Sequence, residues 1–107
     1  NEWSEENIEK GMFEYDHNKP LYVGWDFGKS DDTAIIWTQP YNGKWRIVDT
    51  YRNNNKLIDF YIPFVTGILP SDGYQYSKED LEVIKAHKNW QRGTHFGDPS
   101  GRLTTQV

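Results

Sequence analysis

The chain has 107 residues, of which 36% are hydrophobic and 16% aromatic, and its formal net charge at pH 7 is −4. No cysteine is present, which excludes disulfides and thiolate metal sites. No apolar stretch approaches the roughly 20 residues that span a membrane, and the N-terminus lacks the basic-then-apolar layout of a signal peptide. We expect a soluble, intracellular protein of at most one small domain, or a fragment of a larger one because the sequence begins without methionine.

The first 19 residues are polar and charged. Residues 1–19 are therefore predicted to form a linker or an N-terminal edge segment. A short helix capped by Ser4, with Ile8 and Met12 as its apolar positions, is the alternative. The domain proper is expected to span residues 20–107.

Three strands are predicted in quick succession after this segment. Residues 21–26 form a hydrophobic run typical of a buried strand, and residues 33–38 are expected to pair with it as a hairpin. The dipeptide Asn42-Gly43 is a strong tight-turn signal, and residues 44–51 alternate between two faces after it. One face of that third strand is predicted to hold Trp45, Ile47 and Asp49.

Two helices are predicted next. The first has apolar residues at helical spacing: Leu57, Tyr61, Phe64 and Ile68. Pro63 lies within this stretch and is expected to kink or shorten the helix. Residues 77–80, Ser-Lys-Glu-Asp, resemble a capping box that opens the second helix, which Gly93 is expected to end.

A short fourth strand is predicted at residues 94–97. A strand reached through a helical crossover normally lies parallel to an earlier strand, and residues 21–26 are the expected neighbour. The predicted fold class is α/β, with a mixed sheet of three antiparallel strands followed by a helical crossover to a fourth strand parallel to the first. The carboxyl ends of the first and fourth strands are then adjacent.

Two aspartates follow these adjacent strand ends, each flanked by glycines. Asp26 lies in Gly24-Trp-Asp-Phe-Gly28, and Asp98 lies in Gly97-Asp-Pro-Ser-Gly101. Mg²⁺ prefers oxygen ligands and typically uses one or two carboxylates with water and substrate phosphate. Two such ions can stabilise both the attacking and the leaving oxygen of a phosphodiester displacement. Each aspartate alone is typical of a turn, but their combination at neighbouring strand ends favours a metal site.

These motifs carry a resemblance to a known family. The segment Tyr-Val-Gly-Trp-Asp-Phe-Gly-Lys-Ser-Asp-Asp-Thr-Ala-Ile-Ile, residues 22–36, resembles the opening of the nuclease domain of tailed-phage large terminase subunits. Residues 45–51 and 96–101 match in order and approximate spacing, so the resemblance covers roughly residues 20–102. It implies a ribonuclease H-like fold that cuts concatemeric double-stranded viral DNA during genome packaging, using Mg²⁺ or Mn²⁺ at a two-metal site.

By this resemblance Asp26 and Asp98 are metal-binding catalytic acids. The family has a third acidic ligand further along, expected beyond Val107, with the closing elements of the domain. Its ATPase motor would lie upstream, and no G-x-x-x-x-G-K-[ST] loop occurs in the sequence. The fragment alone is therefore expected to be inactive or weakly active. The resemblance also implies double-stranded DNA, the portal and the small terminase subunit as partners, no membrane, and a location in the host-cell cytoplasm.

Other residues are weaker candidates. Asp31 and Asp32 lie close to the first motif, and Asp32 is a candidate further metal ligand, with a turn acid as the alternative. Lys29 and Arg102 flank the two motifs and are candidate phosphate contacts, with ordinary surface charge as the alternative. The histidine at position 95 is predicted to be structural and to point away from Phe96. His17 and His87 show no ligand-like spacing, and Asp59 is expected on a solvated helix face.

Two other functions remain open from the sequence. Actin-like ATPases and sugar kinases use a Gly-x-Asp-x-Gly turn to bind phosphates, and residues 24–28 fit this pattern. The two acids at positions 31 and 32 would then crowd the phosphate, which disfavours nucleotide binding. The third possibility is a catalytically silent docking module in which the aspartates serve only turns.

Overall fold

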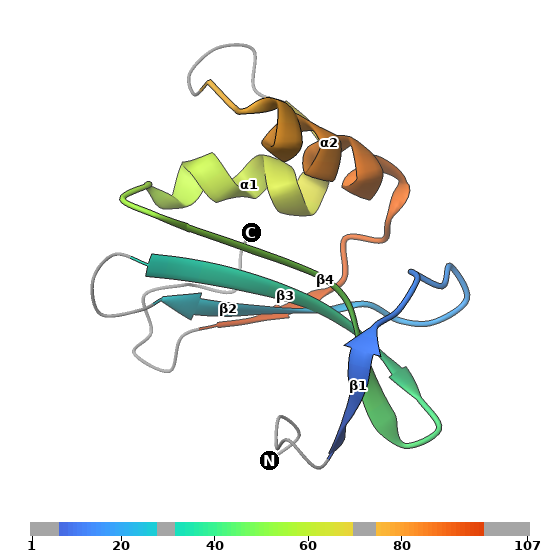
Figure 1. The fold of residues 1–107 in the computed structure, drawn as a ribbon. Helices are drawn as coiled ribbons and strands as arrows, with labels where there is room; N and C mark the ends of the chain where they lie inside the picture. Colours follow the sequence, from blue (N-terminus) through green and yellow to red (C-terminus); the bar gives the residue numbers. More distant parts are fainter. Residues whose placement is uncertain (1–6, 28–31, 70–74, 98–107) are drawn as a thin grey trace.

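The computed structural model describes residues 7–27, 32–69 and 75–97. They form a five-stranded mixed sheet with two helices on one of its faces (Figure 1). The strands are β1 (Ile8–Met12), β2 (Tyr22–Phe27), β3 (Asp32–Tyr41), β4 (Lys44–Asn54) and β5 (Thr94–Phe96). The helices are α1 (Ile58–Thr66) and α2 (Lys78–Ala86), and α2 continues into a 3-10 turn, η2 (His87–Asn89). Neither α-helix of the described ranges has the length and apolar character needed to cross a membrane.

The sheet has the strand order β1-β4-β3-β2-β5. The predicted meander is confirmed, since β2 pairs antiparallel with β3 and β3 pairs antiparallel with β4. Asn42 and Gly43 join the second pair with φ values of 52° and 78°, as an Asn-Gly hairpin turn requires. The predicted parallel return is also confirmed, because β5 pairs parallel with β2 and places Gly24 opposite Phe96.

The N-terminal segment contributes the edge strand β1, which runs parallel to β4. The helix considered for Ile8 and Met12 is therefore wrong. The exposed edge of β4 offers unpaired backbone groups that an extended segment can bond. Arg46 of β4 pairs with Glu9 of β1 at 2.9 Å, and its guanidinium lies 4.3 Å from the ring centroid of Phe13, which follows β1.

A β-bulge interrupts the alternation of β4. Trp37 pairs with Asp49, but the next residue of β3, Thr38, pairs with Ile47, so Val48 is the extra residue. A bulge shifts the facing of the strand by one residue. Asp49 consequently faces the helices, and the prediction that it shares a face with Trp45 and Ile47 is wrong.

The core lies between the sheet and the two helices. It consists of Leu21, Val23, Trp25, Ile35, Trp37, Val48, Phe60, Tyr61, Phe64, Val65 and Ile84. Tyr61 and Phe64 are buried as predicted, but Leu57 and Ile68 are 71% and 63% exposed because the helix begins after Leu57 and ends at Thr66. Gly67 closes it with a φ of 74°.

The second helix begins as its capping residue predicts. The Ser77 hydroxyl oxygen accepts a hydrogen bond of 3.1 Å from the Asp80 backbone N–H. Gly93 does not end this helix, however, because α2 stops at Ala86 and η2 stops at Asn89. Gly93 instead lies directly before β5 with a φ of 79°, where an added Cβ would lie 2.8 Å from the Leu21 carbonyl oxygen.

Candidate active site at the ends of β2 and β5

Asp26 lies near the carboxyl end of β2 with its side chain exposed. The residues on either side of it, Trp25 and Phe27, turn toward the helices, where their rings stack at 6.1 Å and Trp25 also meets Tyr61. Because successive strand residues face opposite ways, Asp26 points to the face of the sheet that α1 and α2 leave open. The sheet therefore holds this carboxylate at a fixed position while solvent reaches it.

Asp26 lines a pocket of about 410 Å³ on this open face. Its lining residues come from β1, β2, β3 and the end of β5: Ile8, Gly24, Trp25, Asp26, Ile36, Phe96 and Gly97. Gly24 shares the face of Asp26 and has no side chain. Gly97 precedes Asp98 in the chain. Asp98 itself lies outside the described residues, so its predicted proximity to Asp26 stays a prediction.

The carboxylate of Asp26 is a suitable oxygen ligand for a hard cation. Within residues 7–27, 32–69 and 75–97 it has no hydrogen-bonding or ion-pair partner, and no group of three or more His, Cys, Asp or Glu residues is placed to bind a metal. Asp26 is therefore an exposed acid that lines a pocket. That arrangement fits part of a carboxylate site whose other ligands come from elsewhere in the chain.

Asp32, the further ligand candidate, is the exposed first residue of β3. It lies two residues from Ala34, the register partner of Asp26, so strand alternation gives Asp32 and Asp26 the same facing. Lys29, Asp31 and Arg102 lie outside the described residues, so their roles stay predictions. Asp59 is exposed in the first turn of α1, as expected of a solvated helix face.

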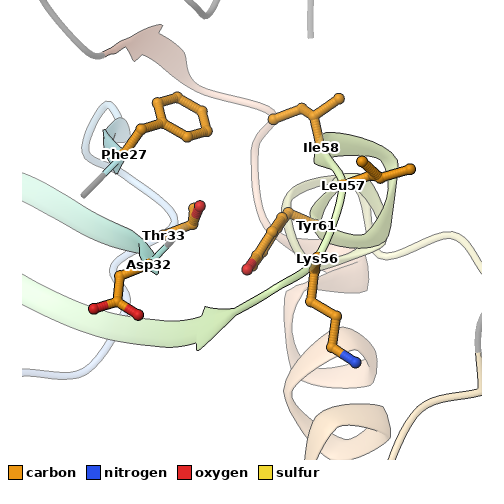
Figure 2. A pocket seen from close by; sticks show the side chains of 7 residues that line it. All are labelled: Phe27, Asp32, Thr33, Lys56, Leu57, Ile58 and Tyr61. Atoms are coloured by element: carbon orange, nitrogen blue, oxygen red, sulfur yellow. The ribbon is translucent and has the colours of Figure 1, made fainter. Parts of the chain in front are cut away.

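A second pocket of about 230 Å³ lies on the helix side of the same sheet end (Figure 2). Its lining residues are Phe27, Asp32, Thr33, Lys56, Leu57, Ile58 and Tyr61. The Tyr61 side chain is fully buried, and within the described part of the chain its hydroxyl forms no hydrogen bond of ordinary geometry, although the Thr33 side chain lies close enough to interact with it. Burial raises the pKa of Tyr61, and the negative charge of Asp32 raises it further, while the Thr33 hydroxyl acts in the opposite direction. The sequence carried no signal for this pocket.

His87 and Asp49 form a pair that the sequence did not predict. The His87 Nε2 lies 2.6 Å from Asp49 Oδ2, and its Nδ1 lies 2.8 Å from the Phe64 carbonyl oxygen. Both ring nitrogens are therefore engaged, and the ring is 1% exposed. A histidine with no free nitrogen and no access to solvent cannot transfer protons to a substrate, so this pair is structural.

His95 lies on the helix side of β5, opposite in facing to Phe96, as predicted. Its Nδ1 accepts a hydrogen bond of 2.9 Å from Trp25 Nε1, and its Nε2 donates to the Arg92 carbonyl oxygen at 3.1 Å. Burial lowers the pKa of His95, and the Arg92 carbonyl partly offsets this. The neutral ring therefore links β5 to β2 directly before the second acidic motif.

The end of β2 thus combines an exposed acid on the open face with a pocket on the helix face. The short parallel strand β5 lies beside β2 and brings Gly97 into the lining around Asp26. Comparisons with known proteins give no match, since no family model, no curated protein and no solved structure is significantly similar to this chain.

Proposed function

We propose that this chain belongs to the nuclease domain of a tailed-phage large terminase subunit. In this proposal the domain has a ribonuclease H-like fold and cuts concatemeric double-stranded DNA during genome packaging, with Mg²⁺ or Mn²⁺ as its cofactor. The observation that carries the proposal is the parallel pairing of β5 with β2, with Gly24 opposite Phe96. This pairing supports the convergence of two acidic motifs, since Asp26 follows Gly24 by two residues and Asp98 follows Phe96 by two residues.

Asp26 and Asp98 would hold the metal, with Asp32 as a further ligand. When bound, the divalent ions supply an activated water and stabilise the leaving oxygen of the cleaved strand. The contribution of the chain is positional, because β2 fixes the Asp26 carboxylate on the open face of the sheet. Lys29 and Arg102, which flank the two motifs in the sequence, would contact neighbouring phosphates of the DNA.

The wider assignments belong to the same proposal. A third acidic ligand, supplied from beyond Val107, would complete the site, and the chain alone would then be inactive or weakly active. The portal, the small terminase subunit and a location in the host-cell cytoplasm follow from the terminase identity. The resemblance of residues 22–36 and 96–101 supports them.

Metal binding tests the proposal directly. We expect electron paramagnetic resonance titrations to show Mn²⁺ binding to the full chain, and Asp26→Asn and Asp98→Asn each to weaken it about tenfold or more, because each removes a charged ligand. Glu82→Gln removes an exposed acid on α2 and should leave Mn²⁺ binding unchanged. Plasmid nicking in Mn²⁺, weak in the full chain and absent in Asp26→Asn, would support nuclease activity. Equal Mn²⁺ affinity of the chain and Asp26→Asn would refute the site.

A further inference from the structure

The register of the sheet places an arginine in line with Asp26. Asp26 of β2 pairs with Ala34 of β3, and Ala34 in turn pairs with Arg52 of β4. The three residues therefore form one row that crosses the sheet perpendicular to its strands. Neighbouring strands lie about 4.8 Å apart, so about 10 Å separates the backbones of Asp26 and Arg52. Ala34 contributes only a methyl group to the row between them.

Arg52 faces the same side of the sheet as the aspartate of this row. Its neighbour Tyr51 packs on α1, where its ring stacks on Phe64 with 4.0 Å between the centroids. Because successive strand residues face opposite ways, Arg52 points to the face that α1 and α2 leave open (Figure 1). Its side chain is exposed there. The row therefore has an exposed carboxylate at one end and an exposed guanidinium at the other.

A second acid lies near Arg52 on the same face. Asp32 pairs with Asn54, so it is a diagonal neighbour of Arg52 across β3 and β4. Diagonal neighbours lie about 7–8 Å apart, within reach of long side chains. Both side chains belong to the described residues, and no ion pair joins them. Arg52 is therefore not held by this acid.

We infer that Arg52 binds a backbone phosphate of a DNA strand that crosses the open face from Asp26 toward β4. A guanidinium binds phosphate oxygens through two parallel hydrogen bonds. Successive phosphates of one strand rise by about 3.4 Å along the helix axis, so Arg52 meets a phosphate about two or three nucleotides from the one held at Asp26. The inference rests on the proposed function, because it takes DNA as the substrate and Asp26 as the place of the cleaved phosphate.

The overall charge of the chain gives such a local contact its weight. The formal net charge is −4, so the surface as a whole repels a polyanion. DNA binding then depends on individual cations that lie beside the site. Strand register puts Arg52 in this position, in the row of Asp26.

DNA binding in metal-free buffer tests the inference separately from metal binding and cleavage. Fluorescence anisotropy of a short labelled DNA duplex is expected to show binding by the full chain. Arg52→Gln should weaken it about tenfold, the equivalent of one charge-assisted hydrogen-bonded contact. The same variant should lower the slope of log K against log salt concentration by about 0.9, the value for one lost phosphate contact. Arg52→Lys keeps the charge and should keep this slope.

Two control comparisons make the result specific to the row. Lys85→Gln removes an exposed cation from α2, on the other side of the sheet, and should bind DNA like the parent chain. Ala34→Glu adds a carboxylate to the row and should weaken binding, whereas Ala86→Glu, the same change at the exposed end of α2, should not. Should Arg52→Gln fail to fold, the two alanine variants decide the question.

The outcomes separate this inference from the proposed function. DNA binding that depends on Arg52 supports the inference even where Asp26→Asn leaves Mn²⁺ binding unchanged, a result that refutes the metal site alone. Three results would overturn the inference and leave the metal experiments standing. They are the absence of DNA binding, equal affinity and salt slope for the parent chain and Arg52→Gln, and a loss in Lys85→Gln as large as that in Arg52→Gln.

Discussion

His87 and Asp49 join η2 to the sheet through a hydrogen bond of 2.6 Å. The His87 side chain is 1% exposed and the Asp49 side chain 30% exposed. The other nitrogen of His87 faces the Phe64 carbonyl oxygen of α1 at 2.8 Å. A carbonyl oxygen only accepts, so Nδ1 carries a proton, and a further proton must lie between Nε2 and the carboxylate. Three elements that are distant in sequence therefore meet at one ring, which also stacks on Trp90 and contacts Trp37.

Asp49→Asn is expected to destabilise the fold by about 1.5–3 kcal/mol, the range for a hydrogen bond to a charged group. The substitution keeps the size of the side chain but removes the charge that faces His87. Urea unfolding followed by tryptophan fluorescence measures the change. The matched control is Glu82→Gln, at an exposed position of α2, which is expected to stay within about 0.5 kcal/mol of the parent chain. Equal unfolding midpoints for the two variants would contradict a structural role for the pair.

The His87–Asp49 pair also shows where prediction from sequence stops. Strands β2 and β3 and the Asn42-Gly43 turn were predictable because their signals are local: a hydrophobic run, and a dipeptide that accepts positive φ. The bulge at Val48 has no such local signal, because it is defined only by the register against Trp37 and Thr38. Without the bulge, alternation places Asp49 on the wrong face, and its pairing with His87 cannot be found.

The same distinction between local sequence signals and tertiary packing applies to the ends of the helices and to the site. The capping of α2 by Ser77 is local and was predictable, whereas the end of α1 depends on Gly67, whose backbone closely approaches Lys88. Asp26 was placed correctly at a strand end because a buried strand followed by a Gly-containing turn is a local pattern. Tyr61 was predicted on the apolar stripe of its helix, but its position beside Thr33 at the start of β3 depends on packing that no spacing in the sequence reveals.

His95 makes the stability of the fold depend on pH. Its Nδ1 accepts a hydrogen bond from Trp25, so protonation at that nitrogen removes the acceptor. Burial lowers the pKa of His95 below its ordinary value of 6.5, so the unfolded chain binds the proton more readily. This contribution to stability is complete above pH 6.5 and is lost as the pH falls from 6.5 through the pKa of the folded state.

His95→Gln tests this dependence, because its amide can accept from Trp25 and donate to the Arg92 carbonyl without titrating. We expect the urea midpoint of the parent chain to fall more steeply between pH 7 and pH 5 than that of His95→Gln. His17→Gln, at an exposed histidine, should behave like the parent chain. Parallel pH profiles for the parent chain and His95→Gln would contradict the assignment.

Tyr61 and Tyr76 provide a matched pair of hydroxyl deletions. Tyr76 donates a hydrogen bond of 2.9 Å to the Phe60 carbonyl oxygen, whereas the buried Tyr61 hydroxyl has no hydrogen bond of ordinary geometry within residues 7–27, 32–69 and 75–97. Tyr76→Phe should cost about 1 kcal/mol of unfolding free energy, and Tyr61→Phe should be neutral or stabilising by up to about 1 kcal/mol. Thermal and urea unfolding of both variants measure the difference. A loss at Tyr61 as large as that at Tyr76 would show that the Tyr61 hydroxyl has a partner in the folded chain.

Alanine substitutions at Gly67 and Gly43 distinguish the stability cost of backbone strain from the stability cost of steric contact. Both have positive φ, at 74° and 78°, but an added Cβ at Gly67 would lie 2.3 Å from Lys88 Cα, whereas at Gly43 it would meet nothing within 4 Å. Gly43→Ala should therefore cost about 1–2 kcal/mol, the left-handed backbone penalty alone. Gly67→Ala should cost more than this, by about 1–3 kcal/mol for overpacking. Equal losses in urea unfolding would mean that α1 and η2 can separate at no cost.

Mn²⁺ should stabilise the fold through Asp26. A ligand that binds only the folded chain adds about 1.4 kcal/mol when its concentration is ten times its Kd. We expect Mn²⁺ to raise the unfolding midpoint of the parent chain and a chelator to reverse the rise. Asp26→Asn should unfold in the absence of metal within about 0.5 kcal/mol of the parent chain, because the side chain is exposed, but it should lose the rise with Mn²⁺. A Mn²⁺ response that persists in Asp26→Asn would place the metal elsewhere, and no response in either protein would favour a docking module whose aspartates serve only turns.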